Sequence, residues 1–319
     1  MTLYPRFMLA AGASGSGKTM ITCGILQALK NRGLETASFK CGPDYIDPLF
    51  HEKVIGARSR NLDTFFTDED VTRYLFARTA AKAQISVMEG VMGYYDGLGG
   101  TTDKASAFDL SRVTDTPVVL IVNTKGMSLS ILAYLKGYLS YRENSNIKGV
   151  ILNQMSPMLY PELKEMIETE LGVHCYGYVP KMADCNLESR HLGLVLPGEV
   201  EQLEHKIRMI AEKLEETLEL DELIRLAEEA PGLEDLSDME EKIRGEAAYL
   251  RERYGDRHPG ERLKIAVSRD EAFCFIYEDN MELLRDLGAE LIGFSPLHDE
   301  KIPEDADGVM FFGGYPELY

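Results

Sequence analysis

The sequence predicts an α/β protein in which a parallel sheet carries helices on both faces. Short apolar runs recur along the first half of the chain with helical stretches between them, which is the alternation of a parallel sheet. A glycine-rich loop separates the first apolar run from the helical stretch that follows it. The runs that we expect to form strands are residues 7–10, 36–39, 85–88, 117–122 and 149–152.

The loop after the first strand matches the phosphate-binding pattern G-x-x-x-x-G-K-[ST]. In such a P-loop the backbone N–H groups and the helix N-terminus face a polyphosphate. Lys18 then reaches the β- and γ-phosphates, and Thr19 ligates Mg²⁺. A glycine-rich turn that matches by chance is the alternative, and the strand-to-helix context disfavours it. The nucleotide-binding residues expected here are Gly12, Ser14, Gly15, Ser16, Gly17, Lys18 and Thr19.

Charged side chains follow the next two predicted strands. Lys40, Asp44 and Asp47 lie in a loop after residues 36–39, and Glu89 closes the strand at 85–88. Ligands of parallel sheets collect at the carboxyl ends of the strands. Taken singly, each acidic residue reads as a solvated turn or helix-cap residue. Their joint placement instead favours carboxylate ligands for one Mg²⁺ and a lysine directed at the phosphates.

Asn153 follows the fifth predicted strand. An asparagine there can pair with the edge of a base, although at a strand end it usually serves the turn. The sequence contains no N-K-x-D motif, so guanine specificity has no support and ATP is the expected nucleotide.

Composition excludes several classes of partner. The formal net charge of -19 disfavours a nucleic-acid binder, which needs a basic face. Five cysteines occur without a C-x-x-C pair, so neither a zinc site nor a disulfide framework is indicated. The longest apolar run outside the loop region, residues 118–122, is too short to span a membrane. We therefore expect a cytoplasmic protein.

The remaining chain suggests further domains. Residues 171–179 continue the first pattern, and we assign 1–198 to one domain. Residues 199–260 are rich in Glu, Lys and Leu and predict an acidic helical segment and linker. A new α/β pattern follows, with strands at 264–267, 289–294 and 308–312 and a helix at 280–287. So short a domain, 261–319, reads as the front part of a larger one.

Six motifs together resemble those of the cobyrinic acid a,c-diamide synthases, glutamine-dependent amidases of the cobalamin pathway in the dethiobiotin-synthetase-like branch of P-loop proteins. Of these motifs, KCGPDYID followed by EGVMGYYDG separates this family from its nearest relatives. The motifs are SGSGKT at 14–19, FKCGPDYIDP at 39–48, EGVMGYYDG at 89–97, SRHLGL at 189–194, DEAFCFIY at 270–277 and FFGGYPEL at 311–318.

The resemblance implies a fold and a chemistry. The P-loop domain would be followed by a flavodoxin-like class I glutaminase domain, of which this chain holds the N-terminal part. The enzyme would be a carbon–nitrogen ligase with glutamine as nitrogen donor. Carboxylates a and c of a tetrapyrrole such as cobyrinate would be activated by MgATP as acyl phosphates and amidated by ammonia from glutamine.

The resemblance also implies roles for individual residues. Lys18 and the loop amides would hold the phosphates, and Lys40 would neutralise charge between the γ-phosphate and the attacking carboxylate. The remaining roles divide into metal ligands, residues that position substrate or ammonia, and residues that bind the peripheral carboxylates of the corrin. These are Thr19, Asp47 and Glu89 for the metal, Asp44, Tyr45 and Asp96 for positioning, and Arg190 and His191 for the corrin.

The chain departs from the family at the glutaminase nucleophile. That nucleophile is a cysteine in a glycine-flanked strand-to-helix turn, and none of the five cysteines has this setting. We expect no glutaminase activity from this polypeptide. It is either a fragment of a longer product or depends on free ammonia or a glutaminase partner subunit; a homodimer is a further expectation.

Three alternatives stay open. The nickel-sirohydrochlorin a,c-diamide synthases, which act in the biosynthesis of a nickel tetrapyrrole coenzyme, share these motifs. A partitioning-type ATPase switch would carry a second lysine where this chain has Ala13, so it is disfavoured. An inactive nucleotide-binding fragment is the third.

Overall fold

The computed structural model describes residues 1–182, 197–234, 237–254 and 262–319. These residues divide into two compact units. The first comprises 1–182 with 197–234, and the second comprises 237–254 with 262–319.

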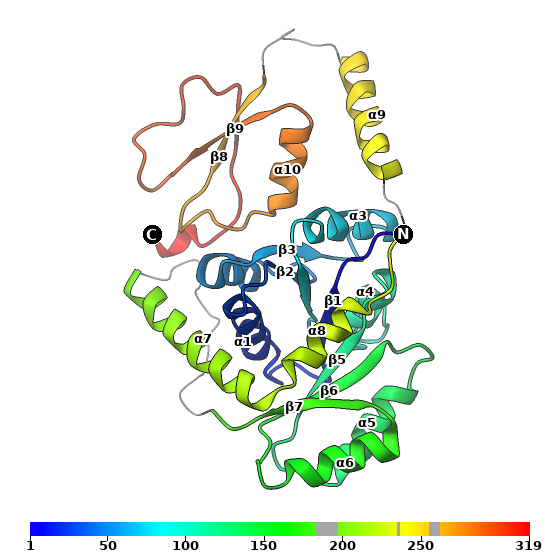
Figure 1. The fold of residues 1–319 in the computed structure, drawn as a ribbon. Coiled ribbons are helices and arrows are strands. Elements are labelled where there is room, and N and C mark those ends of the chain that lie inside the picture. The colour runs from blue at the N-terminus through cyan, green and yellow to red at the C-terminus, as the bar shows by residue number, and fades with distance from the viewer. Residues whose placement is uncertain (183–196, 235–236, 255–261) are drawn as a thin grey trace. The chain divides into compact units, whose positions relative to one another are not determined.

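The first unit is built on a seven-stranded sheet in the order β3-β2-β4-β1-β5-β6-β7 (Figure 1). Every neighbouring pair of strands is parallel, as predicted. The carboxyl ends of β1, β2 and β4 therefore lie side by side and bring their loops together. The strands are β1 Arg6–Ala11, β2 Thr36–Cys41, β3 Arg58–Leu62, β4 Ile85–Glu89, β5 Val118–Asn123, β6 Ile147–Asn153 and β7 His174–Val179.

Strand β3 was not expected from the sequence. Its segment, RSRNL, lacks the apolar run that marks the other strands because it forms an edge of the sheet and pairs with β2 alone. Central strands such as β1 and β2 are buried along their whole length, whereas β3 begins with an exposed residue. Strand β4, expected to be the third strand of the chain, is therefore the fourth.

Helices cover both faces of the sheet (Figure 1). Helices α1, α7 and α8 contact one another or the strands on one face, where Gly24 of α1 lies against Ile210 and Leu214 of α7. The other face carries α3, α4, α5 and α6. Their bounds are α1 Lys18–Asn31, α2 Ile46–Phe50, a π-helix His51–Ile55, α3 Glu69–Ala80, α4 Ala107–Val113, α5 Ser130–Ser140, α6 Tyr160–Leu171, α7 Pro197–Thr217 and α8 Leu220–Glu228. Within the described residues, no helix has both the length and the apolar character needed to cross a bilayer.

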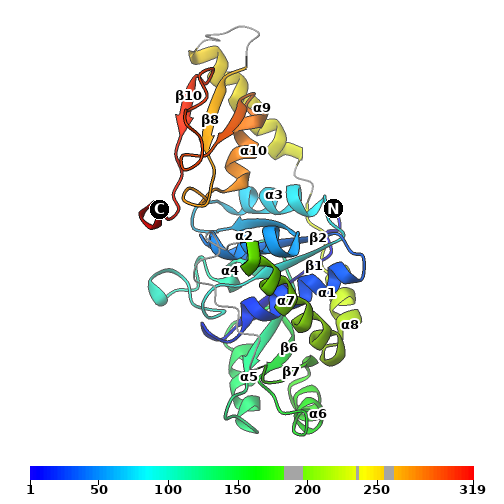
Figure 2. The same cartoon turned by 90° about the vertical axis from the view of Figure 1, so that its left-hand side faces the viewer.

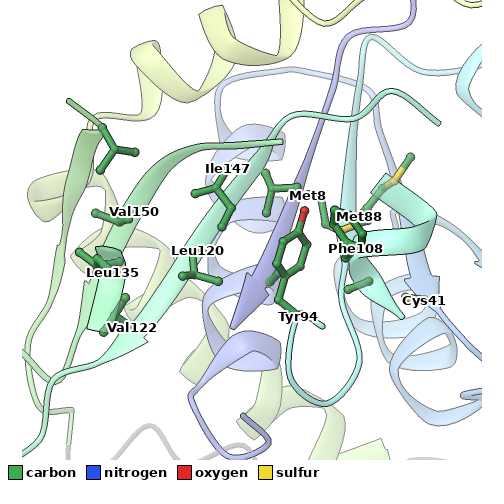
Figure 3. Packing of buried hydrophobic residues seen from close by; sticks show 14 of the residues in the cluster. Met8, Cys41, Met88, Tyr94, Phe108, Leu120, Val122, Leu135, Ile147 and Val150 are labelled. Carbon is green, nitrogen blue, oxygen red and sulfur yellow. The ribbon is translucent and has the colours of Figure 1, made fainter. Parts of the chain in front are cut away.

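The core on the second face joins the strands to the loop after β4. Figure 3 shows Met8, Met88 and Leu120 from neighbouring strands, with Tyr94 and Phe108 packed over them. Tyr94 is fully buried, and its hydroxyl hydrogen-bonds to the Ser145 carbonyl, which anchors the EGVMGYYDG loop to the core.

The acidic helices α7 and α8 belong to the first unit. Helix α7 packs on α1 and β7, and α8 packs on β1. Leu233 extends this packing by pairing its backbone with Thr2. The boundary predicted at 198/199 therefore does not coincide with the division between the two units, because the apolar stripes of these helices complete the core of the first.

The second unit contains a parallel three-stranded sheet in the order β10-β8-β9 (Figure 2). Helix α10 contacts β9. Val309 of β10 is 43% exposed, so part of the sheet is uncovered. The elements are α9 Ser237–Tyr254, β8 Lys264–Ser268, α10 Glu278–Asp286, β9 Glu290–Phe294 and β10 Gly308–Met310. Its assignment as part of a flavodoxin-like glutaminase domain stays a prediction.

Candidate active site

The phosphate-binding loop depends on glycine at its end. Gly17 has φ +92°, and a Cβ there would lie 2.3 Å from Nδ2 of Asn153. Lys18 is buried, and its Nζ donates to the carbonyls of Ala13 at 3.2 Å and Met92 at 2.7 Å. Burial lowers the pKa of Lys18, while nearby Glu89 acts in the opposite direction. The lysine thus lies along its own loop, where a phosphate would replace carbonyl oxygens as its partner.

Asn153 braces this loop from the end of β6. Its Nδ2 donates to the carbonyl of Ser16 at 2.8 Å, and its Oδ1 accepts from the N–H of Gln154 at 2.9 Å. Both ends of the amide are engaged in this structure. The structure therefore gives Asn153 a bracing contact, and its predicted contact with a base stays a prediction.

The three expected metal ligands lie together. Thr19 Oγ1 donates to Glu89 Oε1 at 2.7 Å and lies 3.4 Å from Asp47 Oδ2. Thr19 is the second residue of α1, Asp47 lies in α2, and Glu89 ends β4. Glu89 is fully buried and Asp47 is 6% exposed. The sheet order explains the convergence, because β4 lies between β1 and β2.

Lys40 is the cation of this cluster. Its Nζ lies 2.7 Å from Glu89 Oε1, pairs with Asp47 as well, and lies 3.8 Å from Asp44 Oδ2. The register of the sheet sets Lys40 opposite Glu89 on neighbouring strands. Burial by itself lowers the pKa of Lys40, but the carboxylates of Glu89 and Asp47 outweigh it and raise the pKa above its usual range. Lys40 was expected to face a terminal phosphate; here it neutralises the carboxylates.

The donor set fits a magnesium ion. It consists of a hydroxyl and two carboxylates, the hard oxygen ligands that Mg²⁺ accepts together with phosphate oxygens and water. The second carboxylate oxygen of Glu89 is buried and has no hydrogen-bond partner. Among the described residues no group of three or more His, Cys, Asp or Glu side chains is arranged to hold a metal by itself. Water and phosphate oxygens would complete the ligand set of a cation held here by the hydroxyl and the two carboxylates.

The residues expected to position the substrate have local partners. Asp44 Oδ1 accepts from the N–H groups of Ile46 at 2.8 Å and Asp47 at 3.2 Å, which holds the start of α2. Tyr45 precedes α2 and is partly buried. Asp96 Oδ2 accepts from the N–H of Gly93 at 3.0 Å. Their roles toward a substrate stay predictions. Arg190 and His191 lie outside the described residues.

His51, which lies next to the carboxylate of Glu89, was not identified from the sequence. Its ring is fully buried, and burial lowers its pKa to about 4. Nε2 lies 3.8 Å from Glu89 Oε2, and Nδ1 lies 2.9 Å from Ser38 Oγ. The signal was the spacing: His51 follows Asp47 by four residues, which places both on one helical face.

The described cysteines do not provide a nucleophile. Cys23, Cys41, Cys175 and Cys274 are buried, and none of these four forms a disulfide. Burial raises the pKa of Cys41 to about 12 and that of Cys175 to about 11. Reactive thiols are partly exposed and have lowered pKa values, so none of these four described thiols fits that chemistry.

The chain is similar in sequence to known proteins. Residues 7–195 match the family model CbiA, the CobQ/CobB/MinD/ParA nucleotide binding domain. A cobyrinate a,c-diamide synthase from Clostridium acetobutylicum is 40% identical over 98% of this chain and 67% of its own length. One from Caldanaerobacter subterraneus subsp. tengcongensis is 38% identical over 98% of this chain and 65% of its own length. The chain thus spans about two thirds of the length of these relatives.

A solved structure was also matched at low similarity. The MinC:MinD cell division protein complex of Aquifex aeolicus aligns with TM-score 0.42 and 14% identity, covering 72% of this chain and 98% of that one.

Proposed function

The chain belongs to the cobyrinate a,c-diamide synthase family, and from that membership we propose that it catalyses the ATP-dependent amidation of the a- and c-side-chain carboxylates of cobyrinate. The proposed product belongs to cobalamin biosynthesis. Both relatives described above carry the cobyrinate name, so we propose cobyrinate rather than nickel-sirohydrochlorin as the substrate.

The observation that carries the proposal is the convergence at the ends of β1, β2 and β4. A phosphate-binding loop, two buried carboxylates and a buried lysine meet within hydrogen-bonding distance. Phosphoryl transfer needs alignment and charge neutralisation more than a covalent protein group. This cluster supplies those two requirements.

The proposed reaction has two steps for each amide. A carboxylate oxygen of the substrate forms a bond to the γ-phosphorus as the bond to the β,γ-bridging oxygen breaks, which releases ADP and leaves an acyl phosphate. Ammonia then attacks the acyl carbon, loses a proton, and phosphate departs with its electron pair. The balance requires one ATP and one ammonia for each amide.

Each residue has a proposed part. Lys18 and the N–H groups of the loop bind the phosphates. Thr19, Asp47 and Glu89 would hold Mg²⁺, which supplies charge neutralisation on the phosphates when bound. Lys40 neutralises the carboxylates and then faces the phosphate and the attacking carboxylate. Asp44, Tyr45 and Asp96 position the substrate or ammonia, and Arg190 and His191 bind corrin carboxylates.

The nitrogen source is proposed to be ammonia, normally supplied from glutamine. The buried thiols described above do not suit glutamine hydrolysis. Ammonium should therefore support turnover, whereas glutamine alone should not. We also propose a cytoplasmic location, where ATP is available and free thiols persist.

The test is amidation by the 319-residue chain. Cobyrinate is incubated with ATP, Mg²⁺ and ammonium, and the products are followed by mass spectrometry. The proposal predicts the monoamide and then the diamide, both abolished by Lys18→Ala. Turnover of nickel-sirohydrochlorin without turnover of cobyrinate would contradict the proposed substrate, and product formation by Lys18→Ala would contradict the proposed site.

A further inference from the structure

Two buried polar atoms face each other behind the acidic cluster, and neither has a hydrogen-bond partner among the described residues. They are Nε2 of His51 and Oε2 of Glu89, 3.8 Å apart, on side chains that are each 1% exposed. A hydrogen bond requires about 3.0 Å, so this pair stops short of one by roughly 0.8 Å. Burying a polar group without a hydrogen-bond partner costs free energy, so the facing positions of these two atoms require a physical explanation.

The other side of the His51 ring is anchored to the sheet. Its Nδ1 lies 2.9 Å from Ser38 Oγ, and Ser38 Oγ lies 2.8 Å from Ser59 Oγ. Ser38 of β2 and Ser59 of β3 are directly paired in the strand register, so the two hydroxyls share one face of the sheet. Both serines are buried. The chain Ser59, Ser38, His51 and Glu89 therefore runs from an edge strand to the metal-ligand cluster.

The carboxylate decides which ring nitrogen carries the proton. A neutral imidazole has one N–H and one bare nitrogen. If Nδ1 donated to Ser38, the lone pair of Nε2 would face the lone pairs of Glu89 Oε2. If the Ser38 hydroxyl donates to Nδ1, the N–H on Nε2 is aimed at Oε2. The second arrangement sets an N–H, and not a second lone pair, opposite the carboxylate oxygen at 3.8 Å, so we expect the Nε2–H tautomer.

We propose that His51 is a positioning residue of the magnesium site, with its Nε2–H directed at Oε2 of Glu89. This holds the carboxylate so that its other oxygen, Oε1, faces Thr19. The proposal rests on the proposed role of Glu89 as a metal ligand. Hydrogen bonds to ligating carboxylates fix their orientation, and their loss typically costs about 10- to 100-fold in metal affinity.

The backbone around His51 supports a dedicated position. His51 begins the π-helix that follows α2, and π-helical turns are frequent at functional sites. Its carbonyl accepts from the N–H of Ala57 at 3.0 Å, which ties the end of this segment back to the histidine. The ring is therefore held from its backbone, from Ser38 and from the surrounding core.

The first test is the tautomer, measured without metal or nucleotide. Ring-¹⁵N-labelled protein gives one set of imidazole signals for each histidine, and His51→Gln identifies the set that belongs to His51. The proposal predicts a neutral ring protonated at Nε2. A ring protonated at Nδ1 would overturn it, whatever the outcome for the proposed enzymatic function.

The second test is metal affinity. Mn²⁺ binding is titrated with a non-hydrolysable ATP analogue present. His51→Phe keeps a ring without a donor and should weaken Mn²⁺ binding about 10- to 100-fold, whereas His51→Gln keeps an N–H donor and should recover most of the affinity. Thr22→Val is the matched control, since it removes a different buried polar atom without a hydrogen-bond partner, the hydroxyl of Thr22 on α1, and should bind as wild type.

The outcomes separate the two proposals. Failure of the wild-type chain to bind Mn²⁺ with the nucleotide would count against the proposed function, while the tautomer would still decide the role of the ring. Wild-type affinity in a folded His51→Phe variant would overturn the positioning role and leave the proposed function intact. If His51→Phe does not fold, the tautomer measurement decides.

Discussion

Lys40 and Glu89 lie opposite each other on β2 and β4 and form a buried ion pair, with Nζ 2.7 Å from Oε1. Thr19 donates to the same Oε1. That oxygen is therefore shared between the lysine and the hydroxyl expected to ligate Mg²⁺. A metal ion that binds Glu89 through Oε1 must compete with Nζ of Lys40. We therefore expect either Lys40 or the metal, but not both at once, to neutralise the carboxylates of Asp47 and Glu89.

Replacing the buried lysine, Lys40, should make the stability of the fold depend on Mg²⁺. In Lys40→Met, the buried carboxylates of Asp47 and Glu89 lose their cation, and the free energy of unfolding without Mg²⁺ should fall by about 3–5 kcal/mol. Mg²⁺ should then raise the melting temperature of the variant more than that of wild type. Thermal melts with and without Mg²⁺ measure both effects.

The control for that experiment is Lys136→Met, which removes an exposed lysine from α5. It should melt as wild type does in both buffers. A Lys40→Met protein that matches wild type in stability and in its response to Mg²⁺ would show that the pairing seen here is not important in solution.

Glu89→Gln should abolish amidation. The substitution removes one proposed metal carboxylate and one partner of Lys40, and misplacement at a reacting centre typically lowers the rate by about 100-fold or more. Steady-state formation of the diamide measures the effect. Glu52→Gln, an exposed position on the neighbouring π-helix, should retain activity. Near-normal rates for Glu89→Gln would place the site elsewhere.

Gly17→Ala should weaken nucleotide binding because the added methyl group would collide with Asn153. Gly33 is a comparable glycine at which no such collision occurs. The added Cβ would lie 2.3 Å from Asn153 Nδ2 in a loop with φ +92°. Gly33 has a similar φ of +82° but no atom within 4 Å of its Cβ position. Both alanine variants should lose stability, by about 1–2 kcal/mol from backbone strain. Only Gly17→Ala should weaken ATP binding in calorimetry; equal losses of affinity would refute the steric account.

Cys175 should make the first unit less stable at alkaline pH. Burial raises the pKa of this thiol from 9.0 to about 11, so between these values the unfolded chain loses a proton that the native protein keeps. Stability is therefore fully present below pH 9 and is lost as the pH rises toward 11, by about 3 kcal/mol at most. Urea titrations of wild type and Cys175→Ala should show a shallower alkaline decline in the variant. Parallel curves would mean that the thiol makes no contribution.

The sequence predicted the central strands because strands buried on both faces are continuous apolar runs. It missed β3, whose polar residues suit an edge position. The proximity of Thr19, Asp47 and Glu89 followed from strand ends in a parallel sheet, and the structure brings them within hydrogen-bonding reach.

The partners of Lys40 could not be predicted, because they depend on the register that sets it opposite Glu89. His51 could have been found from its four-residue spacing to Asp47. Its contact with Ser38 could not, since that contact depends on how the π-helix packs against β2.

The central claim is that ATP activates a substrate carboxylate through direct transfer of its γ-phosphoryl group. The most direct measurement is the fate of ¹⁸O in cobyrinate labelled at its carboxylates, incubated with the chain, ATP, Mg²⁺ and ammonium. The account predicts one ¹⁸O in the released phosphate for each amide formed. Amide formation accompanied by unlabelled phosphate would contradict it.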